Sequence, residues 1–260
     1  MNTILIKNKA SIEKMRTAGH ILARIMNTMS QHISPGVSTA ELDQIFEQKM
    51  RAGGLNPECK GYGTYKNATC ISVNDVVVHG IPSKEIILKS GDYVKIDVVG
   101  SYKGYCADMA RGFFVGEINP TAARLASVAQ RALDSAIKKI APGVRLSDIS
   151  ACIQQEVENA GFGVVRYFAG HGIGKSMHEA PDFPNYGKPG QGPILREGMT
   201  FAIEPMITER SYDIHILADG WTAKTVDGGL AAHVEDTVVV TKNGAEILTR
   251  IENSQESKTL

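Results

Sequence analysis

Apolar residues recur at helical spacing in two stretches near the start of the chain. Across Ile12–Met29 they return every three or four positions, and the pattern stops before Pro35-Gly36. The second stretch opens with the capping-box pair Ser38 and Glu41 and stops at Gly53-Gly54. β-rich runs follow, separated by Gly, Asn and Pro, and they predict strands at Ile71–Val78, Tyr93–Val99 and Gly112–Val115.

The second half of the chain repeats this order of elements. A helical pattern covers Arg124–Ile140 and ends at Pro142-Gly143. Ser147 opens another helical pattern with one apolar face, which ends near Gly161. Strand-like runs follow at Gly163–Phe168, Met199–Met206 and Val234–Thr241. Helices followed by strands in both halves indicate an α+β fold.

A constant offset of 107 residues relates the two halves. Pro35-Gly36-Val37 recurs as Pro142-Gly143-Val144. The strand sequences GDYVKID and GMTFAIE keep the same offset, so that Asp97 corresponds to Glu204. Solenoid repeats are about 20–50 residues long, so a single pair at this spacing indicates a duplicated half-domain. We therefore expect two α+β halves about a pseudo-twofold axis, with a site between them.

The length of 260 residues allows one large domain or two small ones, and the composition is that of a soluble globular protein. The predicted organisation is a domain at residues 1–250, with halves at about 11–115 and 121–241 and a polar tail at 251–260. Lysine and arginine number 28, as do aspartate and glutamate, so charge gives no case for binding nucleic acid or an anionic membrane. No apolar run has the length of a membrane span or a signal-peptide core. The four cysteines lack CxxC or disulfide-like spacing, which favours reduced thiols in a cytoplasmic protein.

GDYVKID and GMTFAIE each end on a carboxylate inside an apolar run. Because side chains alternate along a strand, Asp97 points away from the face formed by Val94 and Ile96. Glu204 likewise points away from Ile203. An unpaired buried carboxylate is costly, so each is expected to be protonated, ion-paired or bound to a cation. A salt bridge to a nearby Lys or Arg is the simpler alternative at this point.

Further acidic and imidazole side chains join this pair. Asp108 lies on the strand that forms a hairpin with GDYVKID, and Glu235 adjoins a β-branched run. His171 and His178 lie in the glycine-rich AGHGIGKSMHEAP, and His79 follows three valines. Oxygen-rich ligation with imidazole suits two first-row divalent ions about 3.5–4 Å apart, and suits neither structural zinc nor an EF-hand. The residues indicate a dinuclear metallohydrolase and leave peptidase and phosphoesterase open.

Five longer motifs follow one another along the chain: SVNDVVVHGIP, KIDVVGSYKGYCADMARGFFVG, AGHGIGKSMHEAP, GMTFAIEPM and HVEDTVVVT. With these motifs the chain resembles the type I, bacterial-type methionine aminopeptidases, from the first predicted helix to about Arg250. Those metallopeptidases have the pita-bread fold. The resemblance thus implies two pseudo-twofold-related α+β halves with an antiparallel sheet at the core and helices outside.

The resemblance also implies a role for each candidate residue. Two divalent ions (Co, Mn, Fe(II), Zn or Ni) would be bound, with Asp108 and Glu235 bridging them, and an activated water would attack the scissile carbonyl. Glu204 would move the proton of that water, His178 would hydrogen-bond the carbonyl oxygen, and His79 would contact the scissile amide nitrogen. The implied metal ligands are Asp97, Asp108, His171, Glu204 and Glu235.

The implied methionine pocket is an apolar cup of sulfur and aromatic side chains, which suits a thioether. Its members would be Cys59, Tyr62, Tyr65, Cys70, Met177 and Trp221. From the residues alone, core packing explains Trp221 equally well, and burial as small hydrophobic residues explains Cys59 and Cys70 better. A nucleophilic thiol is disfavoured because no cysteine has a recognisable partner motif.

Three positions depart from the family pattern. Met177 stands where relatives usually have Phe, and its flexibility predicts a looser pocket wall. Val78 stands where relatives often have Cys. Asp236 stands where many relatives have His, which predicts different hydrogen bonding next to Glu235.

The implied function is removal of the N-terminal initiator methionine from nascent polypeptides, with a small second residue preferred. Such an enzyme is expected in the cytoplasm, as a monomer, near the ribosomal peptide exit. An Xaa-Pro aminopeptidase or dipeptidase is the first alternative, but those enzymes usually carry an extra N-terminal domain, and about ten residues precede the first predicted helix here. A non-catalytic binding protein is the second, and it is disfavoured by the complete ligand set and zero net charge.

Overall fold

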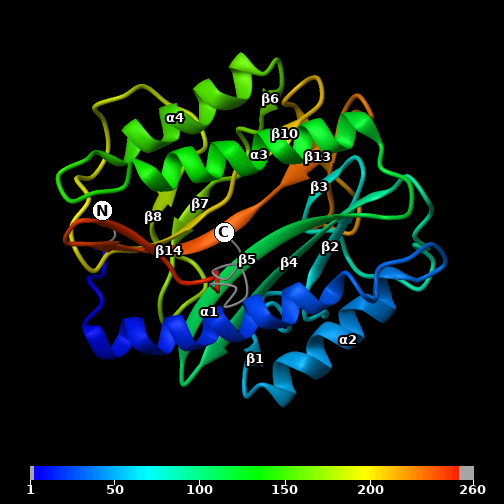
Figure 1. Cartoon of the computed structure of the whole chain (residues 1–260), viewed down its shortest axis with the longest axis horizontal. Helices are drawn as coiled ribbons and strands as arrows, with labels where there is room; N and C mark the ends of the chain where they lie inside the picture. The colour runs from blue at the N-terminus through cyan, green and yellow to red at the C-terminus, as the bar shows by residue number, and fades with distance from the viewer. Residues whose placement is uncertain (1–2, 252–260) are drawn as a thin grey trace, which may run out of the picture.

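A computed structural model describes residues 3–251 of the chain. Its helices are α1 (Lys9–Met29), α2 (Thr39–Ala52), α3 (Pro120–Lys138) and α4 (Leu146–Asn159). Figure 1 shows α1 and α2 on one side of the molecule and α3 and α4 on the other, with long strands running between the two pairs. The predicted polar tail at 251–260 lies outside the described residues, apart from Ile251.

One large antiparallel sheet crosses both halves. The strands are β1 (Asn56–Pro57), β2 (Cys70–Val73), β3 (Val76–Val78), β4 (Tyr93–Tyr102), β5 (Tyr105–Phe114), β6 (Gly163–Val164), β7 (Gly170–Gly172), β8 (Glu179–Phe183), β9 (Thr200–Ile203), β10 (Met206–Thr208), β11 (Ile214–Ile216), β12 (Ala223–Thr225), β13 (Ala231–His233), β14 (Glu235–Thr241) and β15 (Gly244–Ile247). The large sheet has the order β1-β4-β5-β14-β9-β7-β8, with β2 beside β4 and β15 beside β14. Two three-stranded sheets, β13-β10-β6 and β11-β12-β3, complete the described β structure.

In the first half, α1 and α2 pack their apolar faces against the β4–β5 hairpin. Leu22 of α1 and Phe46 of α2 are fully buried. They belong to one apolar cluster with Val94 and Ile96 of β4. This packing agrees with the predicted alternation, because Asp97 lies on the other face of β4 and lines a cavity.

The second half uses the same plan with different helix ends. Asn119 caps α3 through its side chain, which accepts from the first backbone N–H groups. The prediction that Ser147 opens the next helix was wrong. α4 begins one residue earlier, and the backbone N–H of Arg145 donates to the Asp148 carboxylate over 3.1 Å. This reciprocal half of a capping box allows a helix to start without a side-chain cap at Arg145.

Two predicted strands are broken. Ile71–Val78 is divided into β2 and β3 because Asn74 adopts a φ of 51°, a left-handed conformation that begins a turn. Met199–Met206 is divided into β9 and β10 where Glu204 precedes Pro205, which has no backbone N–H to donate. Glu204 therefore lies just beyond a strand end and outside the ladder.

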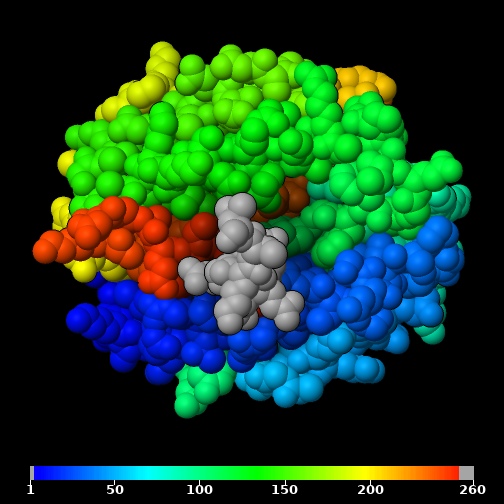
Figure 2. All heavy atoms as spheres, in the orientation of Figure 1, coloured from blue at the N-terminus to red at the C-terminus, as the bar shows by residue number. Residues whose placement is uncertain are grey.

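The duplication is visible in the backbone. Gly54 and Gly161, which follow α2 and α4, both have a φ of 80°. The isolated β-bridge of Ser38 to Ile87 recurs 107 residues later in the second half. The α+β fold with two related halves is therefore confirmed. Figure 2 shows the blue and green helices of the two halves as separate bands, with red-orange C-terminal residues in the seam between them.

The sheet order brings the two halves together at the pair β5 and β14. Glu235 of β14 lies opposite Ala110 of β5. β9 follows β14 on its other side, and β7 follows β9, with His171 opposite Ala202. Acidic residues of the first half and the ligand-type residues of the second half thus reach the same part of the sheet.

Candidate metal centre

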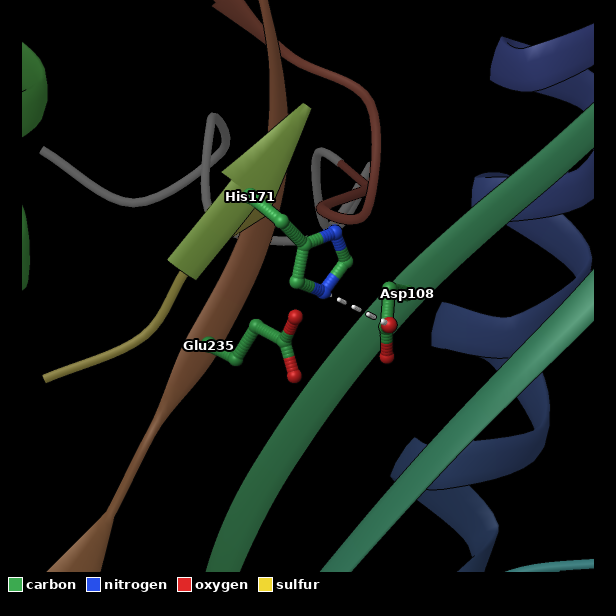
Figure 3. Close-up of side chains that lie close together, drawn as sticks. All are labelled: Asp108, His171 and Glu235. Carbon is green, nitrogen blue, oxygen red and sulfur yellow. Dashed lines mark ion pairs between the residues drawn. The ribbon is translucent and has the colours of Figure 1, made fainter. Parts of the chain in front are cut away.

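Three buried side chains from three strands converge at one point. Asp108 extends from β5, His171 from β7 and Glu235 from β14, and each is at most 7% exposed. One ligand-type atom from each residue lies within 4.8 Å of the other two. Figure 3 shows the imidazole and both carboxylates turned toward a common space.

Glu204 and Asp97 border this cluster. Glu204 Oε1 lies 3.5 Å from His171 Nε2, which also lies 3.8 Å from Asp108 Oδ2. Burial raises the pKa of Glu204 to about 8, and burial with the neighbouring Glu204 raises the pKa of Asp97 to about 6. Burial, followed by the other carboxylates, raises the pKa of Asp108 and Glu235 well above their ordinary values. Without a cation, these acids oppose one another's ionisation.

The cluster has the chemistry of a divalent cation site. Asp108 Oδ1 and Glu235 Oε1 are buried and accept no hydrogen bond within the described structure. Within residues 3–251, Asp108 and Glu204 form ion pairs with histidines alone, and none of the four acids pairs with a lysine or arginine. The simple salt bridge considered for the strand carboxylates is therefore absent. Oxygen-rich donors with one imidazole suit first-row divalent ions, which would bind the buried oxygen atoms that have no hydrogen-bond partner.

His171 has the tautomer that a metal ligand requires. Its Nδ1 lies 3.0 Å from the carbonyl oxygen of Gly172, and the Nδ1–H group donates a hydrogen bond to that oxygen. Burial lowers the pKa of His171 to about 3, so the ring is neutral at physiological pH. The lone pair of Nε2 is thus left facing the carboxylates.

The acids and His171 line one cavity of about 270 Å³. All of the residues predicted for the site border this cavity: Cys59, Tyr62, Tyr65, Cys70, His79, Asp97, Asp108, His171, Met177, His178, Glu204, Trp221 and Glu235. Its lining also includes Val99, Phe168, Ala169 and Met206, which were not predicted. The cavity thus joins a polar cluster to an apolar and aromatic wall.

Sulfur and aromatic side chains form that wall. Cys59, Tyr65 and Cys70 are buried, and Met177 and Trp221 pack against the same cluster. Trp221 meets Tyr65 edge-on with ring centroids 5.1 Å apart. A hydrogen bond with Cys59, and then burial, raise the pKa of the Cys70 thiol well above its ordinary value. Cys70 is therefore a neutral wall residue, as the absence of a nucleophile motif predicted.

His79 and His178 present neutral rings to the cavity. His79 follows β3 with a φ of 58°, a strained conformation for a residue other than glycine, and packs edge-on against Phe168. His178 Nδ1 lies 2.9 Å from the Tyr62 hydroxyl, and its ring lies edge-on to His171 at 4.3 Å. Burial lowers the pKa of both, that of His79 to about 4. Each neutral ring can donate one hydrogen bond.

His233 is a site residue that sequence reasoning missed. It is buried on β13, and its Nε2 lies 3.5 Å from Glu204 Oε2 without a hydrogen-bond partner in the described structure. Burial lowers the pKa of His233 to about 4. The sequence feature that could have indicated His233 is its place at the start of HVEDTVVVT, two residues before Glu235.

The three departures from the family pattern have different surroundings. Met177 lines the cavity, as predicted. Val78 is buried at the end of β3 and does not line it. Asp236 is fully buried and also outside the cavity lining, and it forms ion pairs with Arg111 and Arg250.

Comparison with known proteins agrees with this geometry. Residues 13–242 match metallopeptidase family M24. A methionine aminopeptidase of Clostridium acetobutylicum is 46% identical over 249 residues, covering 96% of this chain and 100% of that protein. The chain belongs to family M24, among its methionine aminopeptidases. A crystal structure of a methionine aminopeptidase from Thermotoga maritima superposes with a TM-score of 0.94 at 46% identity, covering 96% of this chain and 100% of that one.

Peptidases of other specificity share the fold at greater distance. The prolidase from Pyrococcus furiosus has a TM-score of 0.78 at 26% identity, and the match covers 95% of this chain but 66% of the prolidase. The M24 chain described here thus agrees with methionine aminopeptidases in sequence and in length. The predicted fold, enzyme class and use of divalent metal ions are confirmed, with the identity of the metal left open.

Proposed function

We propose that this enzyme removes N-terminal methionine from polypeptides and prefers a small second residue. The observation that carries the proposal is one cavity that combines four acids and a neutral imidazole with a wall of sulfur and aromatic side chains. The polar cluster suits two divalent ions, and the wall suits an unbranched thioether. The cavity places this wall directly beside the polar cluster, so a bound side chain and its reacting bond would lie next to the ions.

Five side chains would hold the ions. Their proposed roles follow the predicted set, with Asp108 and Glu235 bridging and Asp97, His171 and Glu204 completing the site. Bound divalent ions supply a water of lowered pKa and polarise the scissile carbonyl.

Glu204 is the proposed proton carrier. It lies beyond the end of β9, where the ladder does not constrain it. Without a cation, burial raises its pKa to about 8. With the ions bound, an ionised Glu204 would take a proton from the water and return it to the leaving amine. His233 Nε2, 3.5 Å from Glu204 Oε2, is placed to orient this carboxylate.

His178 and His79 are proposed to bind the reacting amide. The Tyr62 hydroxyl lies 2.9 Å from His178 Nδ1, which leaves Nε2 for the carbonyl oxygen as negative charge develops on it. His79, held neutral by burial, would contact the amide nitrogen. Both rings line the cavity together with Trp221 and Met177, the proposed contacts of the methionine side chain.

We further propose that the substrates are nascent chains in the cytoplasm, that the enzyme is a monomer, and that it acts near the ribosomal exit. The four free cysteines support a reducing compartment. No helix in residues 3–251 is long and apolar enough to span a membrane. Zero net charge gives no support to direct binding of nucleic acid.

A peptide panel tests the proposed function. Met-Ala-Ser, norleucine-Ala-Ser, Leu-Ala-Ser and an Xaa-Pro peptide are incubated with chelated enzyme and with enzyme reloaded with Mn(II), Fe(II), Co(II), Ni(II) or Zn(II). We expect cleavage of Met-Ala-Ser that disappears with chelator and returns with metal. Cleavage of the Xaa-Pro peptide alone would contradict the specificity. Cleavage unaffected by chelation would contradict the metal mechanism.

A further inference from the structure

Behind the metal centre, an arginine of β5 and the segment after β15 hold a buried acid of β14. Asp236 is fully buried and accepts hydrogen bonds from Thr249 Oγ1 (2.8 Å), Arg111 Nη2 (2.6 Å) and Arg250 Nε (2.7 Å). Arg250 also donates to Asp134 of α3 over 2.7 Å. Because side chains alternate along β14, Asp236 faces away from Glu235 and the cavity. We call the following residues the clasp: Arg111, Asp236, Thr237, Thr249 and Arg250.

The clasp contacts the backbone of Asp108 through Thr237. The regular pairing of β5 with β14 ends where Asp236 lies opposite Met109. One residue further along, the Thr237 hydroxyl accepts from the N–H of Asp108 and donates to the carbonyl oxygen of the same residue, both over 2.8 Å. The buried hydroxyl thus replaces the sheet hydrogen bonds at Asp108.

Further hydrogen bonds hold the backbone of Thr237 and Glu235. They come from two residues of the clasp and from Leu248. The Thr237 N–H donates to Thr249 Oγ1 over 3.1 Å, and the Leu248 N–H donates to the Thr237 carbonyl oxygen over 2.8 Å. Arg111 Nη1 donates to the backbone carbonyl oxygen of Glu235. The segment from Leu248 to Arg250 is therefore hydrogen-bonded to the strand that carries Glu235 and, through Thr237, to the strand that carries Asp108.

We propose that the clasp is a positioning element for the two bridging metal ligands, an inference that rests on the proposed role of Asp108 and Glu235. Metal binding needs both groups ionised, and two ionised carboxylates repel one another, so a backbone free to relax would separate them. Thr237 holds the backbone of Asp108, and Arg111 holds that of Glu235, against this separation. Hydrogen-bond partners around metal ligands change metal affinity about 10–100-fold.

A clasp that only stabilised the fold would behave differently. Losing it would lower the unfolding temperature and leave metal affinity and the ligand field unchanged. Thr225 of β12 provides the matched control, because it is also a buried threonine whose hydroxyl donates to a backbone carbonyl, that of Gly229, over 2.8 Å. Thr225 does not line the cavity.

The test uses chelated full-length protein titrated with Co(II) and followed by visible absorption, with peptide turnover measured in parallel. Thr237→Val keeps the side-chain shape and removes both hydrogen bonds to Asp108. We expect about 10–100-fold weaker Co(II) binding and altered absorption bands. Thr237→Ser keeps the hydroxyl and should bind Co(II) within about threefold of the wild type. Thr225→Val should lower the unfolding temperature without changing the Co(II) spectrum.

Asp236→Asn extends the test and covers the case in which Thr237→Val does not fold. It preserves the size of the side chain and removes the charge that holds both arginines, so we expect a smaller loss of Co(II) affinity, about 3–10-fold. The proposal would be overturned if Thr237→Val bound Co(II) with wild-type affinity and spectrum. If only Asp236→Asn folds, the same result in that variant would overturn it. An equal loss in Thr237→Ser and Thr237→Val would also overturn it, because the hydroxyl would then be irrelevant.

The wild-type measurements separate this inference from the proposed function. If wild-type protein binds Co(II) and does not cleave Met-Ala-Ser, the peptidase assignment fails while the clasp variants still test metal positioning. If wild-type protein cleaves the peptide and Thr237→Val binds Co(II) equally well, the clasp inference alone fails.

Discussion

The first half of the chain carries Asp97 and Asp108 on the two strands of one hairpin. The second half carries His171 on β7, Glu235 on β14 and Glu204 just after β9. Asp97 is enclosed in a ladder, opposite Cys70 on one side and Ala110 on the other. Its duplicate, Glu204, lies beyond the end of β9. Equivalent positions therefore place Asp97 inside a sheet and Glu204, longer by one methylene, outside it, where Asn185 Nδ2 donates to its backbone carbonyl oxygen over 2.9 Å.

This difference separates holding a metal from moving a proton. A carboxylate fixed on both sides by sheet partners suits constant ligation. A carboxylate at a strand end, with an imidazole 3.5 Å away, suits changing its hydrogen bonds during a reaction. The halves also differ in how their helices begin, since Ser38 caps α2 with its side chain and the equivalent Arg145 does not cap α4.

The largest expected effect separates Glu204 from Asp97. Glu204→Gln removes the proton carrier, and kcat for Met-Ala-Ser should fall by about 10²–10⁴-fold even at saturating metal. Asp97→Asn should mainly weaken metal binding, so excess Mn(II) should restore much of its activity. Steady-state kinetics of both variants at increasing Mn(II) concentrations measure how much activity the metal restores. Equal rescue of both variants by metal would remove the distinction between the two acids.

The second effect is the change with pH in the unfolding free energy of the chelated protein. Because burial raises the pKa of Glu204 from 4.5 to about 8, the folded state retains a proton that the unfolded state has released. The stabilisation is complete below the unfolded pKa and is lost as pH rises toward 8. Between pH 6.5 and 8 this loss is on the order of 2 kcal/mol in unfolding free energy.

Urea denaturation gives the unfolding free energy of chelated wild type and of chelated Glu204→Gln at pH 6.5 and at pH 8. The fall in the wild type minus the fall in the variant measures the loss. The opposing contribution of Lys95, whose pKa burial lowers to about 7, cancels in that difference. Asp108 and Glu235 do not cancel, because Glu204 helps to raise their pKa, and their change has the same sign. Asp97→Asn is the matched control. With a pKa of about 6, Asp97 has largely released its proton by pH 6.5 and should add little above it. An identical slope in wild type and Glu204→Gln would contradict the assignment.

A smaller effect concerns the wall of the cavity, to which the first half contributes Cys59 and Cys70 and the second half Met177 and Trp221. Met177→Phe replaces a flexible wall residue by a rigid one of similar volume. We expect the ratio of kcat/KM for Met-Ala-Ser to that for Leu-Ala-Ser to rise by about three- to tenfold. A ratio unchanged within twofold would mean that this residue does not set selectivity.

The smallest effect compares the two helix starts. The Ser38 side chain accepts from the N–H of Glu41, and the Glu41 carboxylate accepts from the N–H of Ser38. Ser38→Ala should therefore cost about 1 kcal/mol of unfolding free energy, whereas Arg145→Ser should add a few tenths by supplying the missing cap. Denaturant unfolding of metal-loaded protein measures both. Stabilisation by Ser38→Ala, or destabilisation by Arg145→Ser, would contradict this assignment of a capped and an uncapped helix start.

Local patterns predicted the helices and the repeat because each depends on residues close in sequence or on a constant offset, whereas the cavity lining was implied by the family resemblance. They failed where backbone geometry or distant contacts decide. The left-handed Asn74 divides a continuous valine-rich run, and Pro205 ends a strand immediately after Glu204. His233 comes within reach of Glu204 only when β13 packs beside β10. The partners of Asp236 could not be foreseen, because they come from β5 and the end of the chain.

Residues from both halves are proposed to hold two divalent ions inside one substrate cavity. Anomalous X-ray diffraction from crystals of the Mn(II)-loaded protein tests it most directly. We expect two peaks about 3.5–4 Å apart. Asp108 and Glu235 should lie between the two peaks, with Asp97, His171 and Glu204 beside them. Absence of peaks at these residues, or Mn(II) bound by a different set of side chains, would contradict the account.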